Sequence, residues 1–213
     1  MNLSIKKLTD YSLQHSTLPT EVLHELERET NLKTLAPQMI SGALQGQLFS
    51  ILSKMMQPKA ILEIGTFTGY ATICLAQGLQ EDGVLHTIEG NEELKYLIQK
   101  YLAKAGVDNR VQLHIGDAKE IVQTIDEEFD LVFIDAGKND YELYYDLVFD
   151  KVKVGGFILA DNVLWSGKVV QQKHDRDTRI IDAFNKKVQN DAKVENVLLP
   201  IRDGLFLIRK MQN

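Results

Sequence analysis

The sequence has very little cysteine, little proline and no long apolar run. Its 213 residues include one cysteine, Cys74, and four prolines. A single cysteine forms no disulfide within the chain, so a packed core must hold the fold, and a reducing compartment is expected. No segment approaches the roughly 20 apolar residues of a membrane-spanning helix, and the first residues lack the apolar core of a secretion signal. These absences predict a cytoplasmic protein without a membrane span.

Excess positive charge is also missing. The chain carries 24 basic and 30 acidic residues, which gives a net charge of −6. This balance argues against a protein that wraps duplex nucleic acid, although it leaves room for a local basic patch. The five histidines, at positions 15, 24, 86, 114 and 174, show no spacing typical of a metal site. The length suits one α/β domain over residues 1–213 better than two domains.

What the chain does have is a regular alternation of short apolar runs and amphipathic segments. The first 35 or so residues are helix-like and form an N-terminal extension. Strands are then expected at 60–65, 84–89, 110–117, 129–135, 156–161, 194–201 and 203–210, and helices at 41–56, 70–80, 91–106, 141–152 and 177–189. This alternation predicts an α/β fold with helices on both faces of a mostly parallel sheet. The connector at 202–204 is too short for a parallel crossover, so the last strand should run antiparallel.

The loop after the first expected strand indicates a nucleotide-like ligand without a diphosphate. In LEIGTFTG, at 62–69, Phe67 lies between two glycines, Gly65 and Gly69. A dinucleotide-binding loop has the spacing G-x-G-x-x-G, whose middle glycine lets the backbone approach a pyrophosphate. Glu63 places a carboxylate near the loop, which suits a ligand ammonium and repels phosphate. Glu89 ends the next strand, where a carboxylate can accept hydrogen bonds from ribose hydroxyls.

A ribose, an amino group and no phosphate together describe S-adenosylmethionine. Asp117 and Ala118 follow the third expected strand, where the edge of an adenine would lie. Each feature alone is also compatible with an ordinary glycine turn or a solvated charge. Their order on successive strands favours the cofactor.

Polar groups also end two later strands. Asp135 follows the run at 129–134, and Asp161 and Asn162 follow the run at 156–160. Neighbouring strands lie roughly 4.8 Å apart, so these side chains can converge at the edge of the sheet where the active site of such a fold is expected. Two carboxylates and an amide oxygen are a ligand set for a hard cation such as Mg²⁺. Water and a vicinal diol such as a catechol would complete the six positions that Mg²⁺ requires.

Lys138 follows Asp135 by about one turn and is a candidate general base for the acceptor hydroxyl. The resulting phenolate would attack the sulfonium methyl group in line, with no covalent intermediate on the protein. The plainer alternative is a capped turn, in which Asp135 binds loop amides, Lys138 is solvated, and Asp161 with Asn162 starts a loop.

Several segments together resemble a known family. LEIGTFTGYAT, TIEGNEE, FIDAGKNDY, KVGGFILADNVLWSGKV and PIRDGL resemble, in this order, blocks of the cation-dependent S-adenosylmethionine O-methyltransferases. These include catechol O-methyltransferase and, with a closer resemblance, caffeoyl-CoA O-methyltransferase and its bacterial relatives. The resemblance runs from about residue 35 to residue 210. It implies a Rossmann-like class I methyltransferase fold with a seven-stranded sheet, and a homodimer.

The resemblance also implies roles for individual residues. It implies a divalent cation on Asp135, Asp161 and Asn162, with Mg²⁺ expected and Mn²⁺ or Ca²⁺ as alternatives, and Lys138 as the base. It implies substrate contacts from Trp165, with Tyr141 nearby. It implies S-adenosylmethionine contacts from Met39, Glu63, Gly65, Tyr70, Glu89, Asp117, Ala118 and Asp135.

The sequence departs from the family in places that bear on the ligands. After Gly69 and Tyr70 the family commonly has a serine whose hydroxyl can bind the cofactor carboxylate, whereas this chain has Ala71 followed by Thr72. Either Thr72 takes over this contact or the cofactor binds less tightly. Gly137 and Asn139 stand where the plant enzymes often have acidic residues, which weakens any inference of the plant substrate.

Three functional hypotheses follow from these residues. The first is methyl transfer to a catechol-type or phenylpropanoid small molecule. The second is methylation of a hydroxylated uridine in tRNA, as in some bacterial members of the family, which the acidic total and the mixed charges of KVVQQKHDRDTR make less favoured. The third is a non-catalytic protein that keeps the fold, which the intact set of Asp135, Lys138, Asp161 and Asn162 argues against.

Overall fold

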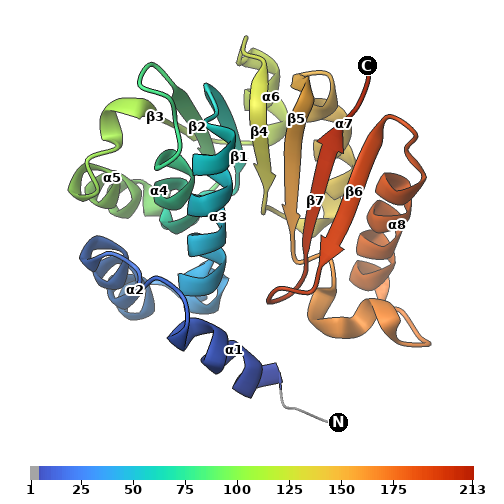
Figure 1. The fold of residues 1–213 in the computed structure, drawn as a ribbon, viewed down its shortest axis with the longest axis horizontal. Helices are drawn as coiled ribbons and strands as arrows, with labels where there is room; N and C mark the ends of the chain where they lie inside the picture. The colour runs from blue at the N-terminus through green and yellow to red at the C-terminus, as the bar shows by residue number, and fades with distance from the viewer. Residues whose placement is uncertain (1–4) are drawn as a thin grey trace.

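The computed structural model describes residues 5–213 and has one seven-stranded sheet at its centre (Figure 1). The strand order is β3-β2-β1-β4-β5-β7-β6. β7 runs antiparallel to both of its neighbours, and the other strand pairs are parallel. The strands are β1 (Ala60–Ile64), β2 (Val84–Glu89), β3 (Val111–Ile115), β4 (Phe129–Ile134), β5 (Val152–Asp161), β6 (Val194–Leu199) and β7 (Leu205–Lys210). The predicted fold, a mostly parallel sheet with an antiparallel last strand, is therefore confirmed.

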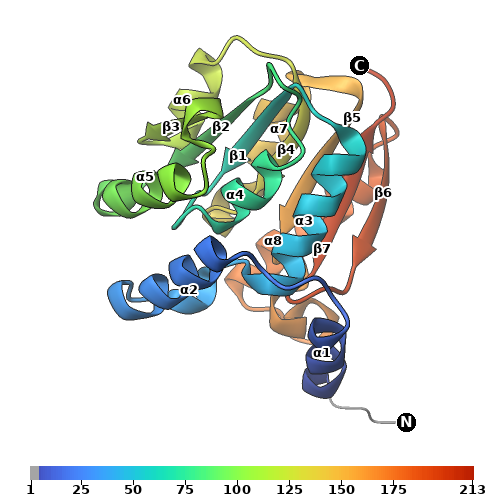
Figure 2. The same ribbon diagram turned by 60° about the vertical axis from the view of Figure 1, so that its left-hand side comes forward.

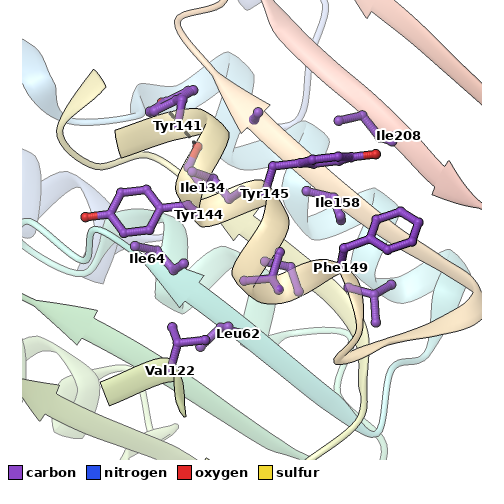
Figure 3. Close-up of a cluster of buried hydrophobic side chains, with 14 of the residues drawn as sticks. Leu62, Ile64, Val122, Ile134, Tyr141, Tyr144, Tyr145, Phe149, Ile158 and Ile208 are labelled. Carbon is purple, nitrogen blue, oxygen red and sulfur yellow. Dashed lines mark hydrogen bonds between the residues drawn. The ribbon is translucent and has the colours of Figure 1, made fainter. Parts of the chain in front are cut away.

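Helices cover both faces of this sheet (Figures 1 and 2). One face carries α3 (Gly42–Met56), α4 (Tyr70–Ala76) and α5 (Lys95–Lys104), and the other carries α6 (Ala118–Thr124), α7 (Tyr141–Phe149) and α8 (Arg176–Asn190). The central strands are mostly apolar because both faces are buried, and Glu63 of β1 is a fully buried exception. In β4, Phe133 packs toward α3, while Ile134 packs under α7. Figure 3 shows the core on the α7 face of the sheet, in which the tyrosines of α7 lie over Leu62, Ile64 and Ile158.

Two further helices precede α3. They are α1 (Ile5–Gln14) and α2 (Glu21–Lys33), and α1 projects away from the sheet (Figure 2). Leu26 of α2 is fully buried, and Glu29 accepts hydrogen bonds from Lys100 (2.5 Å) and Tyr101 (2.6 Å) of α5. These contacts fix α2 against the face that carries α5. Among the described residues, no helix is both long and apolar enough to cross a membrane.

The structure corrects the sequence interpretation at four helices. The helix expected at 141–152 ends at Phe149, because Val152 already begins β5, which therefore starts before the strand expected at 156–161. The helix expected at 70–80 ends at Ala76, and beyond its end Gly78 packs so tightly against the backbone of Ser53 in α3 that a side chain would not fit. The helix expected at 91–106 starts as a 3-10 turn, Glu92–Leu94, before α5. α6 is not predicted by the sequence, because its segment AKEIVQT buries only Ala118 and Val122 and shows little apolar periodicity.

The carboxyl ends of β1, β2, β4 and β5 share one edge of the sheet. The strand order reverses between β1 and β4, which is the point where ligands bind in open α/β sheets. There, Asp135 donates its N–H to the carbonyl of Ile64 (2.8 Å), and Gly65 has a left-handed backbone with φ of 99°. A Cβ atom at position 65 would overlap the carbonyl of Asp135. The close approach of these two loops therefore requires glycine at this position.

Replacing Gly65 by alanine should destabilise the fold strongly. The strained backbone and the overlap with Asp135 together are expected to lower the free energy of unfolding by about 2–6 kcal/mol. Gly90→Ala is the matched control, because Gly90 also follows a strand but has open space around it and no positive φ. Thermal and urea unfolding of both variants measure the difference. Equal stability of the two variants would contradict the role of the close approach.

Candidate active site

A cleft opens at the carboxyl edge of the sheet, between the segment before α3 and the loop after β1. Four of the residues expected to contact the cofactor line it, namely Met39, Gly65, Tyr70 and Asp135. The rest of the lining comes from the same segments and from β4: Ile40, Ser41, Thr66, Phe67, Thr68, Ala71 and Phe133. The loop that the sequence analysis singled out for its glycine spacing thus forms one wall of the cleft.

Glu89 holds this loop in shape from the end of β2. Its carboxylate accepts hydrogen bonds from the backbone N–H of Phe67 (2.7 Å) and of Asn91 (2.8 Å). One bond reaches each oxygen, so each oxygen keeps a second lone pair for a ligand. Asp117 and Ala118 lie past the end of β3, where Asp117 caps α6 by accepting from the N–H of Lys119 (2.8 Å).

Glu63 and Thr72 lie beneath the loop instead of on the cleft. Both are fully buried, and one oxygen of the Glu63 carboxyl accepts hydrogen bonds from the hydroxyls of Thr72 and Thr87. The other oxygen of Glu63 has no protein partner. Burial raises the pKa of the Glu63 carboxyl to about 8. This arrangement differs from the direct cofactor contact expected for Thr72, because its hydroxyl is turned toward β1.

The two acidic strand ends do come together. Ile134 of β4 pairs with Ala160 of β5, so Asp135 and Asp161 are the next residues on adjacent strands. The side chain of Asp161 is 3% exposed. The pKa of Asp135 is raised to about 6: burial is the main cause and the neighbouring Asp161 carboxylate contributes, while Lys138 opposes the shift. Asn162 follows with a left-handed backbone and donates its N–H to Asp161 (2.7 Å).

Lys138 lies beside this acidic pair. Its Nζ is 3.1 Å from Oδ1 of Asp135 and 2.7 Å from the hydroxyl of Tyr141. The Tyr141 hydroxyl in turn donates to the carbonyl of Asp161 (2.9 Å). Tyr141 is fully buried and its ring packs edge-on against Phe184, so it supports Lys138 from below and does not face an open surface, unlike the substrate contact expected from the sequence.

Trp165 lies in the turn after β5. Its backbone and that of Ser166 are left-handed, and the turn is tied to the β6–β7 connection because Ser166 donates its N–H to Asp203. The indole ring is half-buried and packs against the core under α7 and α8. Its Nε1–H is buried without a protein partner, which leaves a hydrogen-bond donor available there.

Two polar residues at the site were not predicted from the sequence. Gln45 of α3 donates to Asp161, and Arg202 of the β6–β7 connection donates to Gln45. No sequence signal marked Gln45. The apolar periodicity of the segment at 41–56 includes Ile51 and Met55, which the structure leaves exposed, while Gln45 and Ser53 lie on the buried face of the helix. Arg202 gave no signal because its position depends on the packing of β7 beside β5.

Stability should depend on pH through Glu63. Below about pH 4.5 the carboxyl is protonated in both states, whereas between about pH 4.5 and 8 only the unfolded chain has lost the proton. The free energy of unfolding should therefore fall as pH rises through this window. Glu63→Gln should remove this part of the slope, on the order of 2–5 kcal/mol in total.

Urea unfolding of the metal-free protein between pH 5 and 8.5 measures this slope. Glu81→Gln, at an exposed position, serves as the control and should leave it unchanged. A Glu63→Gln variant with the wild-type slope would show that the buried carboxyl is ionised in the fold.

Comparisons with known proteins agree with this geometry. Residues 13–211 match the family described as O-methyltransferase. The caffeoyl-CoA O-methyltransferase of Medicago sativa is 34% identical over 220 residues, which cover 96% of this chain and 89% of that protein.

Solved structures share the whole fold. The SAH-bound methyltransferase PaMTH1 of Podospora anserina superposes with a TM-score of 0.90 at 26% identity, covering 100% of this chain and 98% of that one. The O-methyltransferase TomG of Streptomyces achromogenes, in complex with SAM, gives 0.86 at 29% identity, covering 99% and 100% of the two chains. This chain therefore belongs to the O-methyltransferase family, with a caffeoyl-CoA O-methyltransferase among its relatives.

Proposed function

We propose that this enzyme transfers the methyl group of S-adenosylmethionine to one hydroxyl of a vicinal aromatic diol, with a divalent cation held by Asp135, Asp161 and Asn162. The observation that carries the proposal is the pair of carboxylates at the ends of β4 and β5, adjacent to each other and to the cleft. The solved relatives named above hold SAH or SAM. Small aromatic diols and phenylpropanoid thioesters are the acceptor classes to test.

The residues fit a divalent cation. Two carboxylates in one partly buried position repel each other, and Asp161 helps to raise the pKa of Asp135, as expected where a positive charge is needed. No group of three His, Cys, Asp or Glu side chains suited to a metal occurs among residues 5–213. A cation at this edge would therefore use the two carboxylates with the amide oxygen of Asn162, an all-oxygen set that favours Mg²⁺. When bound, it would supply the positive charge that acidifies an acceptor hydroxyl.

The chain itself supplies the proton acceptor and the positioning. Lys138 is held beside Asp135 by its bonds to that carboxylate and to Tyr141. A cation bound to Asp135 would occupy the carboxylate that now pairs with the Lys138 ammonium. As a neutral amine, Nζ could then take the proton of the acceptor hydroxyl while that oxygen attacks the methyl group of the sulfonium and S-adenosylhomocysteine leaves.

The cofactor would occupy the cleft. Gly65 and Tyr70 form its wall beside Asp135, and Met39 closes it from the segment before α3. The free lone pairs of Glu89 would bind the ribose, and Asp117 with Ala118 would contact the adenine. Trp165, half-buried in the turn after β5, would be the aromatic contact of the acceptor.

The acceptor should be an ortho-diol, and turnover should require the cation. A catechol should react at least about tenfold faster than the monophenol of the same shape, because only the diol offers two oxygens. Excess EDTA should abolish turnover while S-adenosylmethionine still binds in calorimetry. Labelled cofactor with catechol, monophenol and bulk tRNA measures all three acceptors. Full activity in EDTA would refute the cation, and transfer to tRNA alone would replace the diol by a nucleic acid.

Lys138→Ala should lower kcat by about 10²–10⁴ if Lys138 is the base. Lys138→Arg should not restore it, because a guanidinium does not act as a base near neutral pH. Lys153→Ala is the matched control, since Lys153 forms the same kind of pair with Asp130 (2.7 Å) at the opposite edge of β4 and β5. Steady-state kinetics with a catechol distinguish the variants. A Lys138→Ala enzyme at the wild-type rate would leave the lysine as a structural partner of Asp135.

A further inference from the structure

A buried amide contacts Asp161 from the side opposite to Lys138 and Tyr141. Gln45, in the first turn of α3, is 1% exposed, and its Nε2 donates to Oδ2 of Asp161 (2.7 Å). The other oxygen of the same carboxylate, Oδ1, accepts the N–H of Asn162 (2.7 Å). Each oxygen therefore has one fixed donor and one free lone pair. Two donors on different oxygens prevent the carboxylate from rotating about its Cβ–Cγ bond.

The orientation of the Gln45 amide is itself determined by a second residue. Nη1 of Arg202 donates to Oε1 of Gln45 (3.1 Å) and to the carbonyl of Ser41. A guanidinium only donates and an ionised carboxylate only accepts, so the amide oxygen must face Arg202 and the amide nitrogen must face Asp161. A flipped amide would lose both bonds. A glutamate here would oppose the charge of Asp161, and an apolar side chain would bind neither partner.

Arg202 reaches Gln45 and Ser41 with its backbone in an unfavourable conformation. Its φ is 51°, in the left-handed region that non-glycine residues rarely adopt, within the connection between β6 and β7. Such conformations persist where the surrounding structure holds the residue in place. Here the bonds to Ser41 and Gln45 hold it. Because Ser41 also lines the cleft, Arg202 connects the cofactor wall to the residue that orients Asp161.

We propose that Gln45 is a positioning residue that holds the Asp161 carboxylate in the orientation needed to bind a cation, and that Arg202 acts through Gln45 by fixing the orientation of its amide. The inference rests on the proposed cation site. It adds a requirement beyond the presence of the ligand residues. The free lone pairs of Asp161 must already point toward the cation site before the ion binds. Residues that orient metal ligands typically change metal affinity by about 10–100-fold when removed.

Mn²⁺ binding by the protein saturated with S-adenosylmethionine tests this, read by the electron paramagnetic resonance signals of free and bound Mn²⁺. Gln45→Leu keeps most of the side-chain volume and removes both hydrogen bonds, and should weaken Mn²⁺ binding by about 10–100-fold and change the spectrum of the bound ion. Gln47→Leu is the matched control, because its side chain lies about 200° further round the same helix. It should bind Mn²⁺ as the wild type does.

Arg202→Met tests whether Arg202 acts through Gln45 or directly on the cation site. Methionine is chosen instead of glycine because glycine would also relieve the left-handed backbone. Arg202→Met should weaken Mn²⁺ binding in the wild-type background and add little in the Gln45→Leu background, since the arginine acts through the glutamine. Additive effects of the two substitutions on Mn²⁺ affinity would show that Arg202 does not act through Gln45.

The outcomes separate this inference from the proposed function. A wild-type protein that binds S-adenosylmethionine but not Mn²⁺ would refute the cation site itself. Wild-type binding of Mn²⁺ with equal affinity in Gln45→Leu, or an equal loss in Gln47→Leu, would refute the positioning role alone. If Gln45→Leu does not melt cooperatively, Arg202→Met decides, and an unchanged Mn²⁺ affinity in that variant overturns the proposal.

Discussion

The pair of carboxylates at the ends of β4 and β5 is the constraint on which the rest of the site depends. The parallel register makes Asp135 and Asp161 the next residues on adjacent strands. Burial, with the nearby Asp161 charge, raises the pKa of Asp135 to about 6, so ionising both groups together is unfavourable without neighbouring donors or positive charge. The polar residues around the pair provide those donors.

The side chains that support the pair come from three segments that are far apart in the chain. Lys138 follows β4 and is supported from below by the buried hydroxyl of Tyr141. Gln45 reaches Asp161 from α3, and Arg202 reaches Gln45 from the β6–β7 connection. Lys138 and Gln45 are each held by a further bond, to Tyr141 and to Arg202 respectively, beyond the one that each makes to the acidic pair. A set of this kind loses little side-chain entropy when a ligand binds, because the side chains are already ordered.

The acidic pair and the cleft share one boundary. The backbone of Asp135 lies so close to Gly65 that no side chain fits between the two loops. Asp135 belongs both to the cleft lining and to the acidic pair. A methyl donor in the cleft and an acceptor at the carboxylates would meet across this single residue, so a shift of either loop would separate the reacting groups. Effective catalysis by positioning depends on such short, rigid connections.

The sequence by itself determined the strands, most helices, the direction of the last strand and the strand ends that carry Asp135, Asp161, Lys138 and Glu89. It could do so because apolar periodicity, glycine spacing and connector length act along the chain. Only the tertiary structure decided that Glu63, Thr72 and Tyr141 lie beneath the surface, and that Gln45 and Arg202 meet at Asp161. Burial and side-chain contacts depend on neighbours brought together by the sheet order, with β7 placed between β5 and β6, and no local pattern records those neighbours.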